Sequence, residues 1–137
     1  MARALRLKAI AKARGLKLLI GADAALARAV GADGIHLPER LAHRAMALRR
    51  AHPDWIVISA AHSLAAARAS RADAVVLSVA FPSRSASAGP TLGPLRLTSR
   101  ARAAGRPAYA LGGVNERTAR RLLATGIIGL AAVEGAR

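Results

Sequence analysis

Short apolar runs alternate along the chain with segments in which apolar residues recur at helical spacing. The runs predict strands over 16–20, 34–37, 55–60, 74–80, 107–111 and 127–133. The segments between them predict helices over 2–14, 24–30, 39–51, 64–70, 94–104 and 116–124, the first with Leu5, Leu7 and Ile10 toward a core. Strands that are apolar on both faces and alternate with helices are typical of a parallel sheet covered by helices. The pattern therefore predicts an α/β protein of parallel βα repeats.

Polar residues and glycines mark the ends of these helices. Asp23, Ser63 and Asn115 stand where N-capping residues belong. Glycine follows several of the predicted helices, at Gly15, Gly31, Gly105 and Gly126. Three similar stretches, 30–35, 70–75 and 125–130, each end a helix, turn tightly and enter a strand. Their spacing is irregular, which favours a βα fold over a solenoid.

Length and composition favour one globular domain. A chain of 137 residues buries roughly two-thirds of its unfolded surface, and a hydrophobic content of 53% argues against disorder. The absence of cysteine excludes disulfides, thiolate metal sites and cysteine catalysis. No signal peptide is apparent, and no apolar run approaches the roughly 20 residues that cross a bilayer. We expect a soluble, cytoplasmic protein without a membrane partner.

The charge is strongly positive, with 22 basic against 7 acidic residues and a net charge of +15. Nucleic-acid binding is one explanation. The arginines, however, are scattered along the predicted helices, and the only aromatic residues that could stack on bases are Trp55, Phe81 and Tyr109. We interpret the arginines as solvated helix faces that also attract anionic substrates.

Two loops predict a phosphate site. Ser83, Arg84 and Ser85 follow the fourth predicted strand and offer hydroxyls and a positive charge. Gly112 and Gly113 follow the fifth and let main-chain N–H groups approach a phosphate before a helix. The alternative is that the serines are ordinary loop residues and the glycines only make a tight turn. In parallel βα folds the carboxyl ends of the strands meet at the ligand-binding face.

Six stretches, taken in order, resemble the thiamine-phosphate synthase family, which includes the related thiazole tautomerase (TenI-like) branch. They are 31–37, 62–64, 72–77, 81–85, 92–93 and 110–115. The resemblance implies a TIM barrel, of which this chain supplies about six of eight strands. It implies one domain over 1–137 that lacks the first two family strands and the last helix. Open sheet edges are costly when exposed, so we expect a homo-oligomer, a rearranged fold or a fragment.

The resemblance also implies a function. Such a protein binds a thiazole phosphate or thiamine phosphate in thiamine biosynthesis. An active member, as a transferase, couples the thiazole phosphate with an aminopyrimidine diphosphate. Ser83 and Ser85 match hydroxyl positions of the family loop, and His62 lies near a position that acts as acid or base in the tautomerase branch. The alternatives are a non-catalytic binder of a phosphorylated ligand and, ranked last, a basic nucleic-acid-binding protein.

The family's magnesium ligands are replaced in this chain. Where the family has an Asn-Asp pair this sequence reads Gly21-Ala22, and Leu41 stands at the position of a further Asp. Asp23 and Glu39 lie close to these positions and would offer Mg²⁺ the oxygen ligands it prefers. The competing interpretation makes Asp23 a helix N-cap and Glu39 a partner of a helix dipole.

Overall fold

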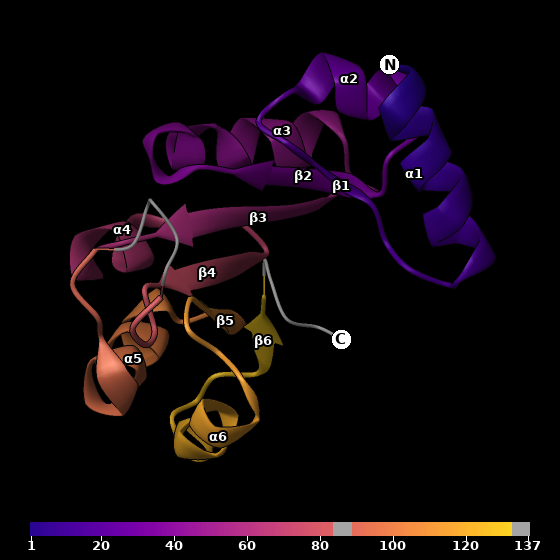
Figure 1. Ribbon diagram of the computed structural model, residues 1–137. Helices are drawn as coiled ribbons and strands as arrows, with labels where there is room; N and C mark the ends of the chain where they lie inside the picture. The colour runs from indigo at the N-terminus through magenta and orange to yellow at the C-terminus, as the bar shows by residue number, and fades with distance from the viewer. Residues whose placement is uncertain (84–88, 133–137) are drawn as a thin grey trace.

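Six parallel strands lie side by side in the order in which they occur along the chain. The computed structural model describes residues 1–83 and 89–132. The strands are β1 (Leu19–Gly21), β2 (Gly34–Leu37), β3 (Ile56–Ala61), β4 (Ala74–Ser78), β5 (Ala108–Leu111) and β6 (Gly129–Ala131). Figure 1 shows the sheet curving into an arc with the helices along its outer side. The predicted fold class, a partial TIM-barrel-like arrangement of parallel βα repeats, is confirmed.

The helices fall where the sequence predicts them, with shorter bounds except for α5, which begins one residue earlier. They are α1 (Ala2–Ala13), α2 (Ala24–Ala29), α3 (Ala45–Ala51), α4 (Leu64–Ala69), α5 (Gly93–Ala104) and α6 (Glu116–Ala119), with 3₁₀ turns η1 (Glu39–Arg44) and η2 (Arg120–Leu122). The three predicted N-caps are confirmed, because the side chains of Asp23, Ser63 and Asn115 accept main-chain N–H groups of α2, α4 and α6. No helix in the described part of the chain is long and apolar enough to cross a membrane.

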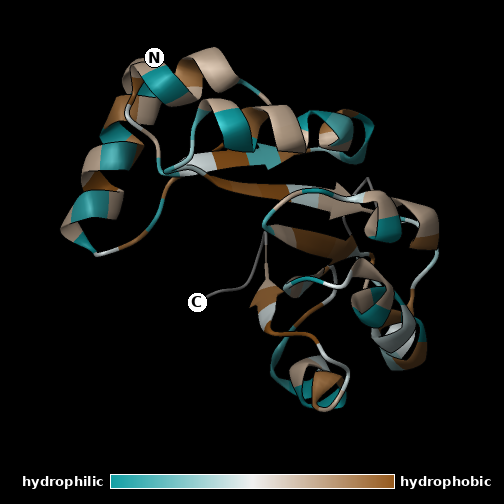
Figure 2. Cartoon of the chain, turned by 180° about the vertical axis from the view of Figure 1, so that it is seen from behind, coloured by the Kyte–Doolittle hydropathy of each residue, from teal (hydrophilic) through white to brown (hydrophobic). Residues whose placement is uncertain are grey.

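The two faces of the sheet have different surroundings. Side chains on the outer face are fully buried beneath the helices, among them Ile35, Leu37, Val57, Val75 and Leu77. Because side chains alternate along a strand, His36, Ile58 and Ser78 lie on the inner face, where they are only half-buried. Figure 2 shows apolar strands and helices of mixed polarity. The core therefore lies between sheet and helices, and the inner face stays partly accessible.

Helix α1 packs through alanines instead of the predicted leucines. Leu5, Leu7 and Ile10 remain 49%, 46% and 41% exposed, so the expectation that they face a core is wrong. Ala4 and Ala11 are buried instead, and Ala4 packs in the cluster that contains Ala27 of α2. Small side chains let two helices approach closely, which favours the alanine face over the bulkier leucine face.

Two of the three similar stretches share one hydrogen-bond arrangement. Asp33 Oδ2 accepts the N–H of Leu18 at 2.9 Å, and Asp73 Oδ2 accepts the N–H of Val57 at 2.9 Å. Each aspartate therefore fastens the turn before one strand to the start of the preceding strand. Asp73 also pairs with Arg49, whose Nε lies 2.6 Å from Oδ1. The repeated sequence thus corresponds to a repeated structural link between successive βα units.

Candidate ligand site at the carboxyl ends of the strands

Polar groups from four neighbouring strands meet at one end of the sheet. Ser78 is the last residue of β4, and His62 comes directly after β3. Glu39 follows β2 by two positions, and Gly112 comes directly after β5. The parallel register pairs Ala61 with Leu77 on neighbouring strands, so the ends of these strands lie level with one another. This is the edge at which the sequence predicts a ligand site.

His62 is held by side chains from three other elements. Its Nδ1 lies 2.9 Å from Ser78 Oγ. Its main-chain N–H donates to Glu39 Oε2 of η1, and its carbonyl accepts from Arg100 of α5 at 2.6 Å. The side chain of His62 is nevertheless exposed. A histidine at this edge is therefore fixed in place while remaining accessible to a ligand.

The two loops predicted to bind phosphate are in contact. Gly112 accepts the N–H of Phe81 at 3.0 Å, and a Cβ on Gly113 would collide with the carbonyl oxygens of Phe81 and Pro82. Gly113 also has φ of +61°, which favours glycine. The tight-turn interpretation of the glycines therefore holds. The same packing places the turn against Phe81 and Pro82, which directly precede Ser83 in the sequence, so the turn does not exclude a role in binding.

One main-chain donor of this turn has no hydrogen-bond partner in the described part of the chain. Asn115 already accepts the N–H groups of Arg117 and Thr118 at the start of α6, so the short helix itself offers little to an anion. Within residues 1–83 and 89–132, the N–H of Gly113 has no hydrogen-bond partner. Ser83 is half-buried next to Pro82. Arg84 and Ser85 lie outside the described residues, and their predicted role stays a prediction.

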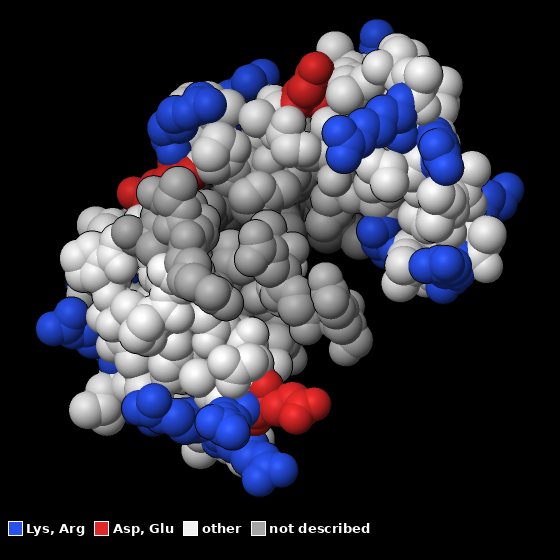
Figure 3. Space-filling model, viewed as in Figure 1, with Lys and Arg blue, Asp and Glu red and all other residues white. Residues whose placement is uncertain are grey.

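Two arginines that the sequence did not single out for the site lie close to it. Arg100 reaches the His62 carbonyl from α5. Arg121 lies over the ring of Phe81, with its Cζ 5.1 Å from the ring centroid. On the face shown in Figure 3, Lys and Arg gather over α1 and over α6, at the two ends of the arc. The positive charge expected to attract anions is therefore present at the loop as well as on solvated helix faces.

The candidate magnesium ligands each bond to the main chain. Asp23 Oδ1 accepts the N–H of Leu26 at 2.8 Å as an N-cap, and Glu39 Oε2 accepts that of His62. Among the residues that the structure describes, no three His, Asp or Glu side chains are grouped to hold a metal. The fit to Mg²⁺ is therefore poor, and Mg²⁺ binding stays a prediction. The bond from His62 to Glu39 was not foreseen from the sequence.

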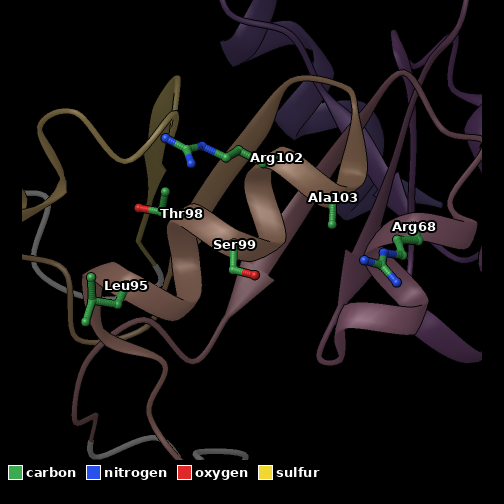
Figure 4. Close-up of a pocket in the computed structure, with 6 residues that line it drawn as sticks. All are labelled: Arg68, Leu95, Thr98, Ser99, Arg102 and Ala103. Carbon is green, nitrogen blue, oxygen red and sulfur yellow. The ribbon is translucent and has the colours of Figure 1, made fainter.

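Neither His36 nor a cavity between two helices contributes to the hydrogen bonds that hold His62. His36 is half-buried on the inner face of β2, and burial lowers its pKa from 6.5. A cavity of about 480 Å³ lies between α4 and α5, away from the strand ends, and Figure 4 shows its two arginines. Arg102 points away from Arg68, so no charged groups converge there. The strand-end cluster is the stronger candidate.

Comparison with known proteins identifies a family of the same architecture. Residues 1–136 match the profile of the family described as thiamine monophosphate synthase. A thiamine-phosphate synthase of Chromobacterium violaceum is 31% identical over 137 residues, which cover 97% of this chain and 66% of that protein. A provisional thiamine-phosphate synthase 2 of Aquifex aeolicus is 32% identical over 129 residues, covering 92% of this chain and 69% of that protein.

A solved structure supports the fold. The thiamine phosphate pyrophosphorylase of Pyrococcus furiosus superposes with a TM-score of 0.76 at 23% identity, covering 96% of this chain and 64% of that chain. The chain thus spans about two-thirds of the length of the relatives it matches.

Proposed function

The chain belongs to the thiamine monophosphate synthase family, and on this premise we propose that it binds a thiazole phosphate or thiamine phosphate at the carboxyl ends of β3, β4 and β5. The observation that carries this proposal is the packing of Gly113 against Phe81 and Pro82. That packing brings together the two loops that the sequence marks for phosphate. Among residues 1–83 and 89–132, nothing accepts the N–H of Gly113. Gly113 lies next to Pro82, the residue before Ser83.

The proposed ligand lies across the ends of neighbouring strands. Its phosphate accepts hydrogen bonds from the N–H of Gly113 and from Ser83, with Arg84 and Ser85 as further predicted contacts. Arg121, which stacks on Phe81, adds positive charge next to this loop. The ring of the ligand then extends toward His62 at the end of β3, because β4 and β3 are the next strands along the sheet.

The proposed reaction is the coupling of a thiazole phosphate with an aminopyrimidine diphosphate in thiamine biosynthesis. Departure of diphosphate develops negative charge, which fixed donors and cations stabilise. Among the described residues, Arg100 and His62 can serve this role, because Arg100 reaches the His62 carbonyl at 2.6 Å at the end of β3. His62 is also the candidate acid or base of the tautomerase branch.

A second function, binding without turnover, is favoured by one specific observation. Asp23 and Glu39 each use a carboxylate oxygen to accept a main-chain N–H. A magnesium site built from them would have to compete with an N-cap and with the anchor of His62. A non-catalytic binder of a phosphorylated ligand needs neither carboxylate, so it is compatible with these bonds.

Thermal unfolding with and without thiamine phosphate tests the binding proposal. A ligand at one hundred times its Kd stabilises the folded state by about 2.7 kcal/mol, which gives a rise of several degrees in Tm. We expect that rise in the wild type, and a smaller one in a double variant carrying Ser83→Ala and Ser85→Ala. Ser99→Ala, which removes an exposed hydroxyl on α5, is the matched control.

A turnover assay then separates the two functions. With aminopyrimidine diphosphate, thiazole phosphate and Mg²⁺ in excess, product formation supports the synthase, and the serine double variant should raise its KM. A ligand-induced rise in Tm without product supports the non-catalytic binder. If Tm does not rise at saturating thiamine phosphate, both proposed functions are overturned.

A further inference from the structure

Three hydrogen bonds restrain His62, although this residue is exposed and precedes a short helix. Glu39 holds its N–H, Arg100 holds its carbonyl and Ser78 bonds its ring. These three partners come from η1, α5 and β4. The two main-chain bonds fix where the residue stands. Within the described residues, only the bond to Ser78 acts on the imidazole, and this bond orients the ring.

The chemistry of the pair gives Ser78 a second effect. A neutral imidazole has one protonated and one unprotonated nitrogen, whereas a serine hydroxyl both donates and accepts. The Oγ–Nδ1 distance of 2.9 Å is a normal hydrogen bond. Whichever group donates, the bond selects one tautomer of His62 over the other. It therefore also selects what the remaining ring nitrogen, Nε2, can do.

We propose that Ser78 is a positioning residue whose hydroxyl donates to Nδ1 of His62 and so keeps the ring proton on Nε2. Nε2–H is then a hydrogen-bond donor for an anionic oxygen of the bound ligand. This inference rests on the proposed function for the nature of that ligand. Ser78 itself does not touch the ligand in this arrangement.

Two observations favour this direction of the bond. The Ser78 hydroxyl has no other acceptor within the described residues, so donation to Nδ1 satisfies its proton. Nε2 of His62 likewise has no hydrogen-bond partner among residues 1–83 and 89–132. A protonated Nε2 donates to the anionic ligand of the proposed function, next to the positive charge of Arg100. An unprotonated Nε2 would present a lone pair to the same anion.

Nitrogen-15 NMR of the full chain tests the proposal directly. Two-bond ¹⁵N–¹H spectra distinguish a protonated from an unprotonated ring nitrogen. They are recorded at about pH 8, above the ordinary histidine pKa. We expect His62 to show one tautomer, with the proton on Nε2. Exposed His43 on η1 is the internal reference for a tautomer mixture. His62→Gln and His43→Gln assign the two sets of signals.

The Ser78 variants supply the control for this measurement. Ser78→Ala should convert the His62 signals to the averaged pattern of His43, and Ser78→Thr, which retains a hydroxyl, should restore the single tautomer. A wild-type His62 that resembles His43, or that carries its proton on Nδ1, would overturn the proposal. A single tautomer that persists in Ser78→Ala would also overturn it. If Ser78→Ala does not fold, the wild type and Ser78→Thr still decide.

Ligand binding separates this inference from the proposed function. His62→Ala, which removes every side-chain donor at this position, should weaken thiamine phosphate binding by about tenfold, the cost of one hydrogen bond to a charged group. His43→Ala should leave it unchanged. Unaltered binding in His62→Ala would overturn the donor role alone. A locked tautomer in a protein that binds no thiamine phosphate would overturn the proposed function and leave the role of Ser78 standing.

Discussion

Lys8 Nζ lies 2.7 Å from Asp33 Oδ2, and the same oxygen accepts the main-chain N–H of Leu18 at 2.9 Å. One carboxylate therefore joins α1, the segment before β1 and the turn that enters β2. The hydrogen bond from Lys8, followed by that from Leu18, lowers the pKa of Asp33 from 3.8 to about 2. The folded state thus favours the charged form of this side chain.

Asp33→Asn should lower the free energy of unfolding at neutral pH by about 1–2 kcal/mol, because it removes a charge-assisted bond and leaves Lys8 without its close partner. Urea unfolding monitored by circular dichroism measures the difference. Asp54→Asn, an exposed carboxylate, should change stability by less than about 0.5 kcal/mol. Equal effects of the two substitutions would contradict this role of Asp33.

The contribution of Asp33 should depend on pH in a defined direction. Its folded pKa of about 2 lies below its ordinary value of 3.8, so its stabilising effect is present above pH 3.8 and is lost as the pH falls toward 2. Unfolding curves of wild type and Asp33→Asn should therefore differ most at neutral pH and converge in acid. If the stability difference between wild type and Asp33→Asn stays constant down to about pH 2, the charge of Asp33 is not the source of that difference.

Gly113→Ala should destabilise the fold by about 1–3 kcal/mol and lower thiamine phosphate affinity as well. The added Cβ meets the carbonyls of Phe81 and Pro82, and φ of +61° is strained for alanine. Gly21→Ala is the matched control, since nothing lies within 4 Å of its Cβ position. Thermal unfolding measures the stability of both variants. A Gly113→Ala protein as stable as Gly21→Ala would show that the turn relaxes without cost.

The β6 edge should promote self-association, as expected for an open sheet edge. Leu123, Ile128 and Leu130 are 78%, 61% and 49% exposed and line a cavity of about 340 Å³ beside it. The net charge of +15 opposes association, so we expect association to increase with salt. Sedimentation velocity at rising protein concentration measures it.

Leu130→Lys should suppress this association, because a charge on an edge strand discourages pairing. Leu95→Lys provides the comparison, since Leu95 is 88% exposed on α5, away from the edge. A wild-type protein that stays monomeric at high salt, or equal effects of the two lysines, would argue against the edge as the contact.

Much of the fold could be predicted because local and long-range signals agree. Asp23, Ser63 and Asn115 cap helices as their sequence positions indicate, and β2 has the predicted bounds. The other strands differ from their predicted bounds by a few residues, because the end of hydrogen-bond pairing, and not the end of an apolar run, ends a strand. Helix α1 was misjudged because Leu5 and Ile10 suggest a core face, while close packing selected the alanine face.

The candidate site was predicted in part. The contact between the Gly112–Gly113 turn and the segment before Ser83 follows from the shared edge of parallel strands. Ser78 could have been noticed, since it interrupts an apolar run. Arg100 carries no local signal: its bond to His62 joins residues far apart in sequence, and only the packing of α5 on α4 brings them together.

The agreement between strand order and chain order also constrains how the protein is assembled. Each new strand pairs with the one made just before it, so the sheet can extend from its N-terminal side during synthesis. Closing a longer span costs more entropy and slows the pairing of distant segments. The longest interval between neighbouring strands separates Ser78 from Ala108. The segment proposed to hold phosphate is thus part of the span whose closure we expect to limit the rate of folding.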